Sequence, residues 1–272
     1  MLVLRAEIAL DAENFDECLI AARHGLKSVE EVGPERARLL ALEAYANFYL
    51  DKVEEARVLF NEAVRADRSS WTAILGRAMV HEHKGYLRAT LLDVDRAIEL
   101  DDQESQPFAI RASVYLRSGA LVEAERDFGF AVELDPEDEE TRLQLARLQA
   151  FDRRTSAAIE TLEPLVEDGE EPEFVIPAAL LRSQLSLTLG STEAAAEDAQ
   201  KAIDLDPDEP WGYLQLAACH LTAMNAGKAL EALKEAAAKV NDERDLPDLF
   251  VLRASAYDQL EKPEKAQQLR EA

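Results

Sequence analysis

Cysteine and long apolar runs are both scarce in this chain. Only two cysteines, Cys18 and Cys219, occur among its 272 residues, and their separation fits neither a disulfide framework nor a paired metal-binding motif. No apolar run approaches the ~20 residues that a membrane-spanning helix needs. The first ten residues already carry Arg5 and Glu7, unlike a signal peptide. We therefore expect a protein of a reducing compartment, cytoplasmic and with no segment inserted in a membrane.

Positive charge is also in short supply. The chain has 55 acidic and 30 basic residues, which gives a formal net charge of −25. Such a charge repels nucleic-acid phosphates and anionic lipid head groups. The composition therefore disfavours a nucleic-acid or anionic-membrane partner. The 47% of hydrophobic residues is normal for a chain that buries a core, so we expect a folded acidic protein.

One sequence pattern recurs along the whole chain. Its clearest copy spans residues 105–138 and reads SQPFAIRASVYLRSGALVEAERDFGFAVELDPED. Each copy has a small residue near the start of its second half, and eight such anchor residues occur, at Cys18, Ala56, Thr90, Ala124, Ala158, Ala195, Ala229 and Ala266. The commonest step between anchors is 34 residues, as between Ala56 and Thr90. Stacked supersecondary units give such a period.

The spacing of apolar residues within one copy predicts two amphipathic helices. Apolar residues recur every three or four positions in each half of the copy, as at Phe128 and Ala131 in the second half. Small residues at Ala112 and Ala124 let the two helices approach closely. Three copies place a glycine between the helices, where a chain reversal favours positive φ, at Gly85, Gly119 and Gly190.

In its period and layout the chain resembles the tetratricopeptide repeat family over essentially its full length. The resemblance implies an all-α fold, a right-handed α-solenoid (superhelix) of about eight helix-turn-helix repeats in a single array over residues 1–272. The approximate repeat boundaries are 1–34, 37–70, 71–104, 105–138, 139–172, 176–209, 210–243 and 247–272.

Proline positions test this layout, because proline inside a helix costs ~3 kcal/mol and proline in a first turn costs little. Six prolines precede a predicted helix or lie in its first turn, namely Pro34, Pro107, Pro177, Pro210, Pro247 and Pro263. Pro136 and Pro207 close a repeat, and Pro172 lies in an insertion. The exception is Pro164, which predicts that the helix carrying it ends or kinks near Glu163.

Neither end of the array carries the polar capping helix that stacked repeats normally need. The first repeat starts partway into its first helix, and the last stops inside its second. This pattern favours a chain cut from a longer protein; the alternative is that a partner or another copy covers the ends.

The sequence offers no set of residues that favours catalysis or metal binding. His81 and His83 are two residues apart and point to different sides of a helix, so they cannot chelate a metal from one face. Cys18 and Cys219 are interpreted as small buried residues. The acidic clusters 135–140, 167–173 and 204–209 are interpreted as solvated helix boundaries. We expect no enzyme activity, no cofactor and no metal.

The resemblance also implies a concave groove, formed mainly by the first helix of each repeat, that holds a segment of a partner protein. The family's inward positions are mostly apolar here, and exposed apolar patches usually mark interaction sites. The candidate groove residues are Arg38, Tyr45, Phe48, Tyr49, Met79, His83, Leu116, Arg117, Arg147, Phe151, Gln184, Trp211 and Leu214.

One subfamily binds the carboxyl-terminal tails of chaperones through a clamp of lysine, asparagine and arginine side chains. The corresponding positions in this chain are Ala41, Tyr45, Gly76, Gln106 and Ile110. They lack the charge-assisted donors that a buried carboxylate needs. An apolar segment, or a basic amphipathic one steered by the acidic rim, is therefore the more plausible ligand.

Three functional hypotheses follow. The first is a non-enzymatic scaffold that binds another protein in its groove. The second is a recruiting domain of a larger enzyme or of a secretion or assembly machine, and the unfinished ends motivate it. The third is self-assembly, in which the uncapped ends or the apolar groove bind another copy and form a homo-oligomer.

Overall fold

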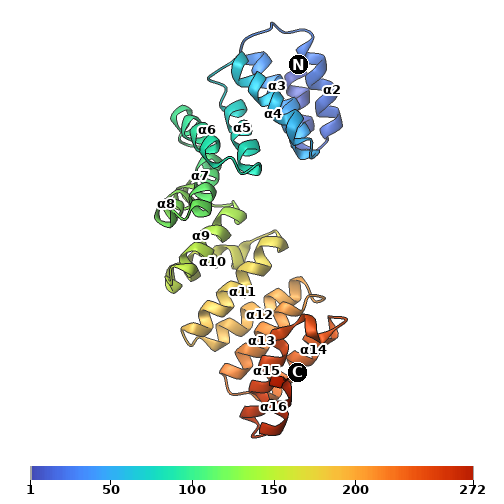
Figure 1. Cartoon of the computed structure of the whole chain (residues 1–272), viewed down its shortest axis with the longest axis vertical. Coiled ribbons are helices and arrows are strands. Elements are labelled where there is room, and N and C mark those ends of the chain that lie inside the picture. Colours follow the sequence, from blue (N-terminus) through green and yellow to red (C-terminus); the bar gives the residue numbers. More distant parts are fainter. Residues whose placement is uncertain (1, 272) are drawn as a thin grey trace. The chain divides into compact units, whose positions relative to one another are not determined.

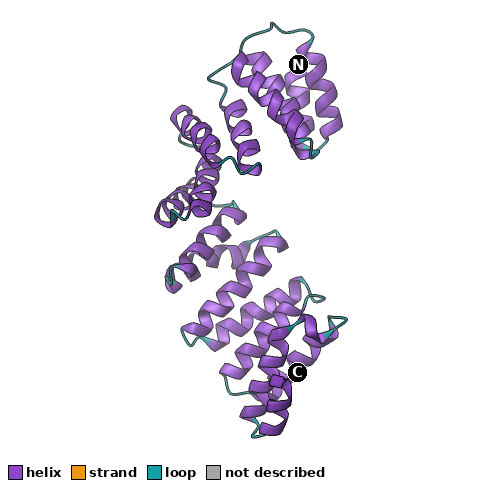
Figure 2. Cartoon of the chain, viewed as in Figure 1, coloured by secondary structure: helices purple, strands orange, loops and turns teal. Residues whose placement is uncertain are grey.

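The computed structural model describes residues 2–271, and within that range the chain is helical and contains no strand (Figure 2). Within residues 2–271, sixteen α-helices and one short 3-10 helix form two compact units, an N-terminal unit that ends at Pro136 and a C-terminal unit that begins at Glu137. Each unit contains four consecutive pairs of antiparallel helices (Figure 1). The all-α repeat fold expected from the sequence is confirmed.

The N-terminal unit contains the first eight helices. They are α1 (Leu2–Asp11), α2 (Phe15–Leu26), α3 (Pro34–Tyr49), α4 (Val53–Ala66), α5 (Trp71–His83), α6 (Leu87–Leu100), α7 (Ser105–Ser118) and α8 (Leu121–Leu134). Each helix packs against the next one in sequence, and the first helix of each pair also packs against the first helix of the following pair.

The C-terminal unit repeats this arrangement. Its helices are α9 (Glu139–Phe151), α10 (Thr155–Asp168), α11 (Pro172–Thr188), α12 (Thr192–Leu205), α13 (Pro210–Thr222), α14 (Ala226–Ala238), α15 (Pro247–Gln259) and α16 (Pro263–Glu271), with a 3-10 helix at Glu243–Asp245. The first helices α9, α11, α13 and α15 pack in succession.

The eight anchor residues are all completely buried. Each lies in the first turns of the second helix of its pair, and each has an exposed fraction of 0%. A side chain no larger than threonine lets the backbones of the two helices approach closely at this point. The prediction of close helix crossings at a 34-residue period is confirmed.

The turn between the two helices of every pair has the same geometry. The residue five positions before each anchor has a positive φ, and these residues are Glu13, Asp51, Gly85, Gly119, Arg153, Gly190, Met224 and Glu261. The next backbone N–H then bonds a carbonyl five residues back, as between Ala120 and Tyr115 at 2.9 Å. Such bonds satisfy carbonyl groups that a helix end would otherwise leave unpaired.

The structure corrects the sequence prediction at three prolines. Pro172 is the first residue of α11 and does not lie in an insertion, so α11 begins four residues before the expected 176. Pro177 consequently lies inside α11 and not in its first turn. The helix α10 does not end near Glu163, because it continues past Pro164 to Asp168. A kink at Pro164 stays a prediction.

These interior prolines are tolerated for a local reason. A proline removes the hydrogen bond to the carbonyl group four residues earlier, which belongs to Glu160 for Pro164 and to Glu173 for Pro177. Both glutamates are exposed, so water can bond the carbonyl groups that the prolines leave free. The sequence rule that places proline at helix starts does not take this exposure into account.

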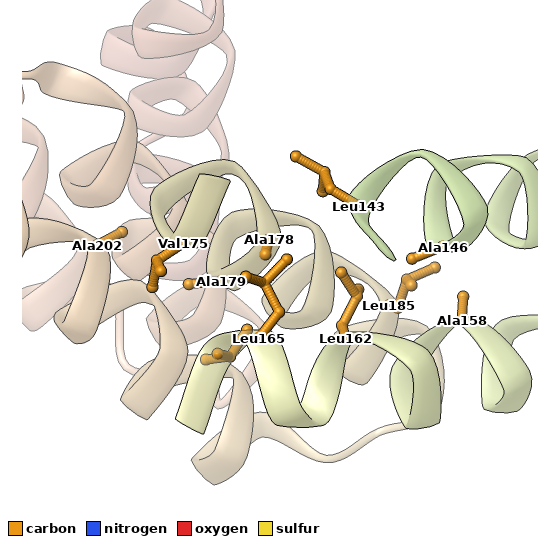
Figure 3. Close-up of a cluster of buried hydrophobic side chains, with 11 residues drawn as sticks. Leu143, Ala146, Ala158, Leu162, Leu165, Val175, Ala178, Ala179, Leu185 and Ala202 are labelled. Carbon is orange, nitrogen blue, oxygen red and sulfur yellow. The ribbon is translucent and has the colours of Figure 1, made fainter. Parts of the chain in front are cut away.

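The buried side chains of each unit form clusters that span neighbouring pairs. In the C-terminal unit one cluster joins α9, α10, α11 and α12, with Leu162 at 0% and Leu165 at 2% exposed fraction (Figure 3). Anchor Ala158 and Ala146 of α9 belong to it and are fully buried. The helix pairs are therefore joined by side-chain packing.

Three pairs also contain an arginine–aspartate bridge across the helix crossing. An arginine of the first helix meets an aspartate sixteen residues later, in the bridges Arg77–Asp93, Arg111–Asp127 and Arg182–Asp198. Asp127 is fully buried, and Nε of Arg111 lies 2.5 Å from its carboxylate. Arg111 also reaches Asp95 of the preceding pair at 2.8 Å, so this side chain links one pair to the next.

The anchor burial generates a first prediction. Ala195→Glu places a carboxylate at the crossing of α11 and α12 without a partner, so we expect the C-terminal unit to unfold. Ala194→Glu is the matched control, because Ala194 lies beside the anchor on the same helix and is exposed. Circular dichroism of both variants measures the effect; equal helicity would contradict the role of the anchor.

The turn geometry generates a second prediction. Gly119 has a φ of 81°, Gly129 lies inside α8, and neither has an atom within 4 Å of where a Cβ would stand. Gly119→Ala should therefore lower the free energy of unfolding by about 1 kcal/mol through backbone strain alone. Gly129→Ala should raise it by about 0.5–1 kcal/mol, because alanine favours a helix interior. Urea unfolding distinguishes the two signs, and a loss in both variants would refute the prediction.

The bridge of Arg111 and Asp127 generates a third prediction. Arg111→Leu leaves a buried carboxylate without its main partner and should cost about 3 kcal/mol of unfolding free energy. The double variant with Asp127→Ala should recover most of that loss, since the equivalent positions of the seventh pair are Leu216 and Ala232. A double-mutant cycle in urea measures the coupling, and strictly additive losses would rule it out.

Candidate functional site

The C-terminal unit contains a groove formed by the first helices of its four pairs. It has a volume of about 520 Å³. The residues that line it are Arg147 from α9, Pro177, Leu180, Leu181 and Gln184 from α11, Trp211, Leu214, Gln215 and Ala218 from α13, and Asp248, Val251 and Leu252 from α15. Successive first helices are neighbours in a repeat array, which is why residues 147 and 252 reach the same groove.

The lining of this groove is mainly apolar, and part of it is open to solvent. Trp211 is 50% exposed and Val251 is 63% exposed, whereas Leu214 is 5% exposed and belongs to the core beneath. The central helix α13 carries no Asp, Glu, Lys or Arg. In a chain with a net charge of −25, this helix therefore contributes only uncharged, mainly apolar side chains to the groove.

Two carboxamides add hydrogen-bonding capacity to the groove. Nε2 of Gln215 donates to the hydroxyl of the buried Ser183 at 3.0 Å, and that hydroxyl bonds the carbonyl of Ala195 at 2.6 Å. The Gln215 side chain is thereby held in position. Gln184 is exposed on α11 and can bond a ligand directly.

Four of the predicted groove residues lie together in this lining, namely Arg147, Gln184, Trp211 and Leu214. Phe151 does not line it, although its ring is 75% exposed on the last turn of α9. Sequence reasoning about the site missed other lining residues, namely Pro177, Leu181, Gln215, Asp248 and Leu252. Asp248 has the signature of an ordinary acidic residue in a first helical turn, so nothing in the sequence singled it out.

The predicted aromatic residues of the N-terminal unit lie in one cluster around Tyr49. The Tyr49 ring is 52% exposed and stacks on Phe15 with a centroid distance of 5.3 Å. Phe48 contacts Tyr49 and also His83 of α5, whose ring lies 5.7 Å from its own. This cluster crosses α2, α3 and α5 and is a partly exposed aromatic surface.

Tyr45 is a correction to the predicted groove. Its side chain is 9% exposed, packs edge-on against Phe60 at 4.9 Å and donates its hydroxyl hydrogen to the carbonyl of Thr72. Burial raises the pKa of its phenol. Tyr45 is therefore a core residue, and an interior hydrogen bond satisfies its polar group.

The other predicted residues of the N-terminal unit are divided between ion pairs and partial burial. Arg38 pairs with Glu7, and Arg117 pairs with Glu82 at 2.6 Å. Met79 and Leu116 are partly buried.

The residues that could support chemistry are buried or dispersed. Burial raises the pKa of the Cys18 thiol to about 11 and also raises the pKa of Cys219, which disfavours the reactive thiolate of both. Across residues 2–271, no three His, Cys, Asp or Glu side chains group in a way that could hold a metal ion. In the same range, every helix is too short or too polar to cross a bilayer.

Comparisons with known proteins match the repeat architecture. The family model described as "Tetratricopeptide repeat" matches residues 176–209. DnaJ homolog subfamily C member 3 of Rattus norvegicus is 29% identical over 184 residues, which cover 61% of this chain. The match spans only 35% of the length of that relative.

Two solved structures show the same fold. The C-terminal part of a tetratricopeptide repeat protein from Cytophaga hutchinsonii has a TM-score of 0.68 at 16% identity, covering 84% of this chain and 92% of its own. YrrB, described as a tetratricopeptide repeat protein with an unusual peptide-binding site, has a TM-score of 0.55 at 20% identity, covering 71% and 95% respectively. The eight helix pairs of this chain thus share the fold of solved tetratricopeptide repeat proteins, and the pair at residues 176–209 matches the family model itself.

Proposed function

We propose that this protein is a non-enzymatic scaffold that binds an apolar segment of a partner protein in the groove of its C-terminal unit. Tetratricopeptide repeat proteins generally mediate contacts between proteins. The observation that carries the proposal is the convergence of α9, α11, α13 and α15 on one open, mainly apolar groove. Burying exposed apolar surface of this kind against a partner is energetically favourable.

The size of the groove favours a short segment as the ligand. Its volume of about 520 Å³ lies within the ~300–1,000 Å³ typical of pockets that enclose small ligands. A few large side chains of a partner can fill it, with Trp211 as the aromatic contact that interfaces favour. The similarity in fold to YrrB, a tetratricopeptide repeat protein with a peptide-binding site, supports this class of ligand.

The proposal assigns no catalytic role to the chain. The tetratricopeptide fold is typically a scaffold, and the thiols of Cys18 and Cys219 are buried with raised pKa values. A cytoplasmic location, expected from the scarcity of cysteine, belongs to the same proposal.

A pair of exposed apolar residues provides the test. Val251→Asp places a carboxylate in the groove, and Leu189→Asp places one at a similarly exposed site outside its lining. Peptides that bind the whole chain are first selected from a displayed random library. We expect these peptides to bind the Val251→Asp variant at least tenfold more weakly and the Leu189→Asp variant with unchanged affinity. The reason is that a peptide in the groove would have to desolvate the new carboxylate at position 251 but not the one at position 189.

Tryptophan emission measures this binding. The chain has two tryptophans, so Trp71→Phe leaves Trp211 as the sole emitter. A bound apolar segment should shift the emission of Trp211 to shorter wavelength. Peptides that bind both Asp variants equally would refute the groove as the binding site. Light scattering that shows concentration-dependent association, abolished by Val251→Asp, would instead favour binding of a second copy.

A further inference from the structure

The groove of the C-terminal unit has one positively charged and one negatively charged side chain, and helices without charged groove residues separate them. Arg147 is the only lining residue contributed by α9, and Asp248 comes from α15, three pairs later in the chain. The lining residues of α11 and α13 between them are apolar or uncharged, including Gln184 and Gln215. The groove is therefore positively charged at the α9 end and negatively charged at the α15 end.

Neither charge is neutralised within the protein. Arg147 and Asp248 are both exposed, and no ion pair of either occurs between residues 2 and 271. Other arginines on first helices of the same unit differ in this respect. Arg182 bonds Asp198 at 2.6 Å, and Arg253 bonds Glu243 at 2.6 Å. The two groove charges thus remain available to a ligand.

From this arrangement, and resting on the proposed function, we infer that the groove takes a dipolar segment in one fixed direction. The segment has a few large apolar residues at its centre, an acidic residue at the end over Arg147 and a basic residue at the end over Asp248. The apolar centre supplies affinity by covering Trp211 and Val251. The two charges select direction and reject segments with the opposite charge order.

The experiment exchanges the two charges. The variant Arg147→Glu with Asp248→Lys keeps the apolar lining, reverses its polarity and removes no ion pair, so it should fold like the original chain. Peptides are selected from the same random library on each protein, and circular dichroism confirms that both are equally helical. Two synthetic peptides of identical composition, a selected sequence and its counterpart with acidic and basic residues exchanged, are then titrated against both proteins.

We expect each protein to prefer the opposite member of the peptide pair, by about tenfold in Kd. Each exposed ion pair contributes little by itself, but the exchange turns attraction into repulsion at both ends of the segment, so the two effects add. The preference should fall as salt is raised.

Two other outcomes are distinguishable. If selected peptides lose affinity for Val251→Asp but bind the exchanged variant as before, the groove binds apolar segments and the inferred direction is wrong. If no selected peptide depends on Val251, the proposed function fails and the inference fails with it.

Discussion

The fold depends on the close approach of two helices at eight fully buried small residues. At Ala124 and its equivalents no side-chain surface remains exposed, so a larger or charged residue would push the pair apart. The crossing has to recur with every helix pair, which sets the 34-residue period. The helix crossing also determines the turn that precedes it. The chain must reverse direction five residues before the buried small residue, through a residue with positive φ such as Gly119 or Arg153. Local turn and long-range packing are thus one constraint.

This constraint explains why the fold could be predicted from the sequence and the proline exceptions could not. The anchor residues can be recognised from their spacing in the sequence alone. The effect of a proline, by contrast, depends on whether water reaches the carbonyl group four residues earlier. Pro164 and Pro177 each free the carbonyl of an exposed glutamate, and both helices continue. A rule stated for helix interiors in general overestimates the cost at such positions.

The candidate site was predictable in part, for a similar reason. Position in the repeat predicts which side of the first helix faces inward, and Arg147, Gln184 and Trp211, which were named on that basis, line the groove of the C-terminal unit. Position does not tell whether a neighbouring pair covers that side. Tyr45 occupies an inward position, yet Phe60 and the carbonyl of Thr72 enclose it. Whether a groove position is exposed depends on the neighbouring helix pairs, so the sequence of a single repeat does not determine it.

The distribution of charge explains how an acidic chain can keep an apolar groove. Acidic residues concentrate at helix boundaries such as 204–209, where they favour the start of the following helix and keep the surface solvated. Where a charge does enter a helix crossing, as at Asp127, an arginine of the same pair balances it. These two placements leave α13 with no Asp, Glu, Lys or Arg. The acidic clusters and the apolar lining of the groove are therefore separate, and Arg147 and Asp248 are the two charged side chains in that lining.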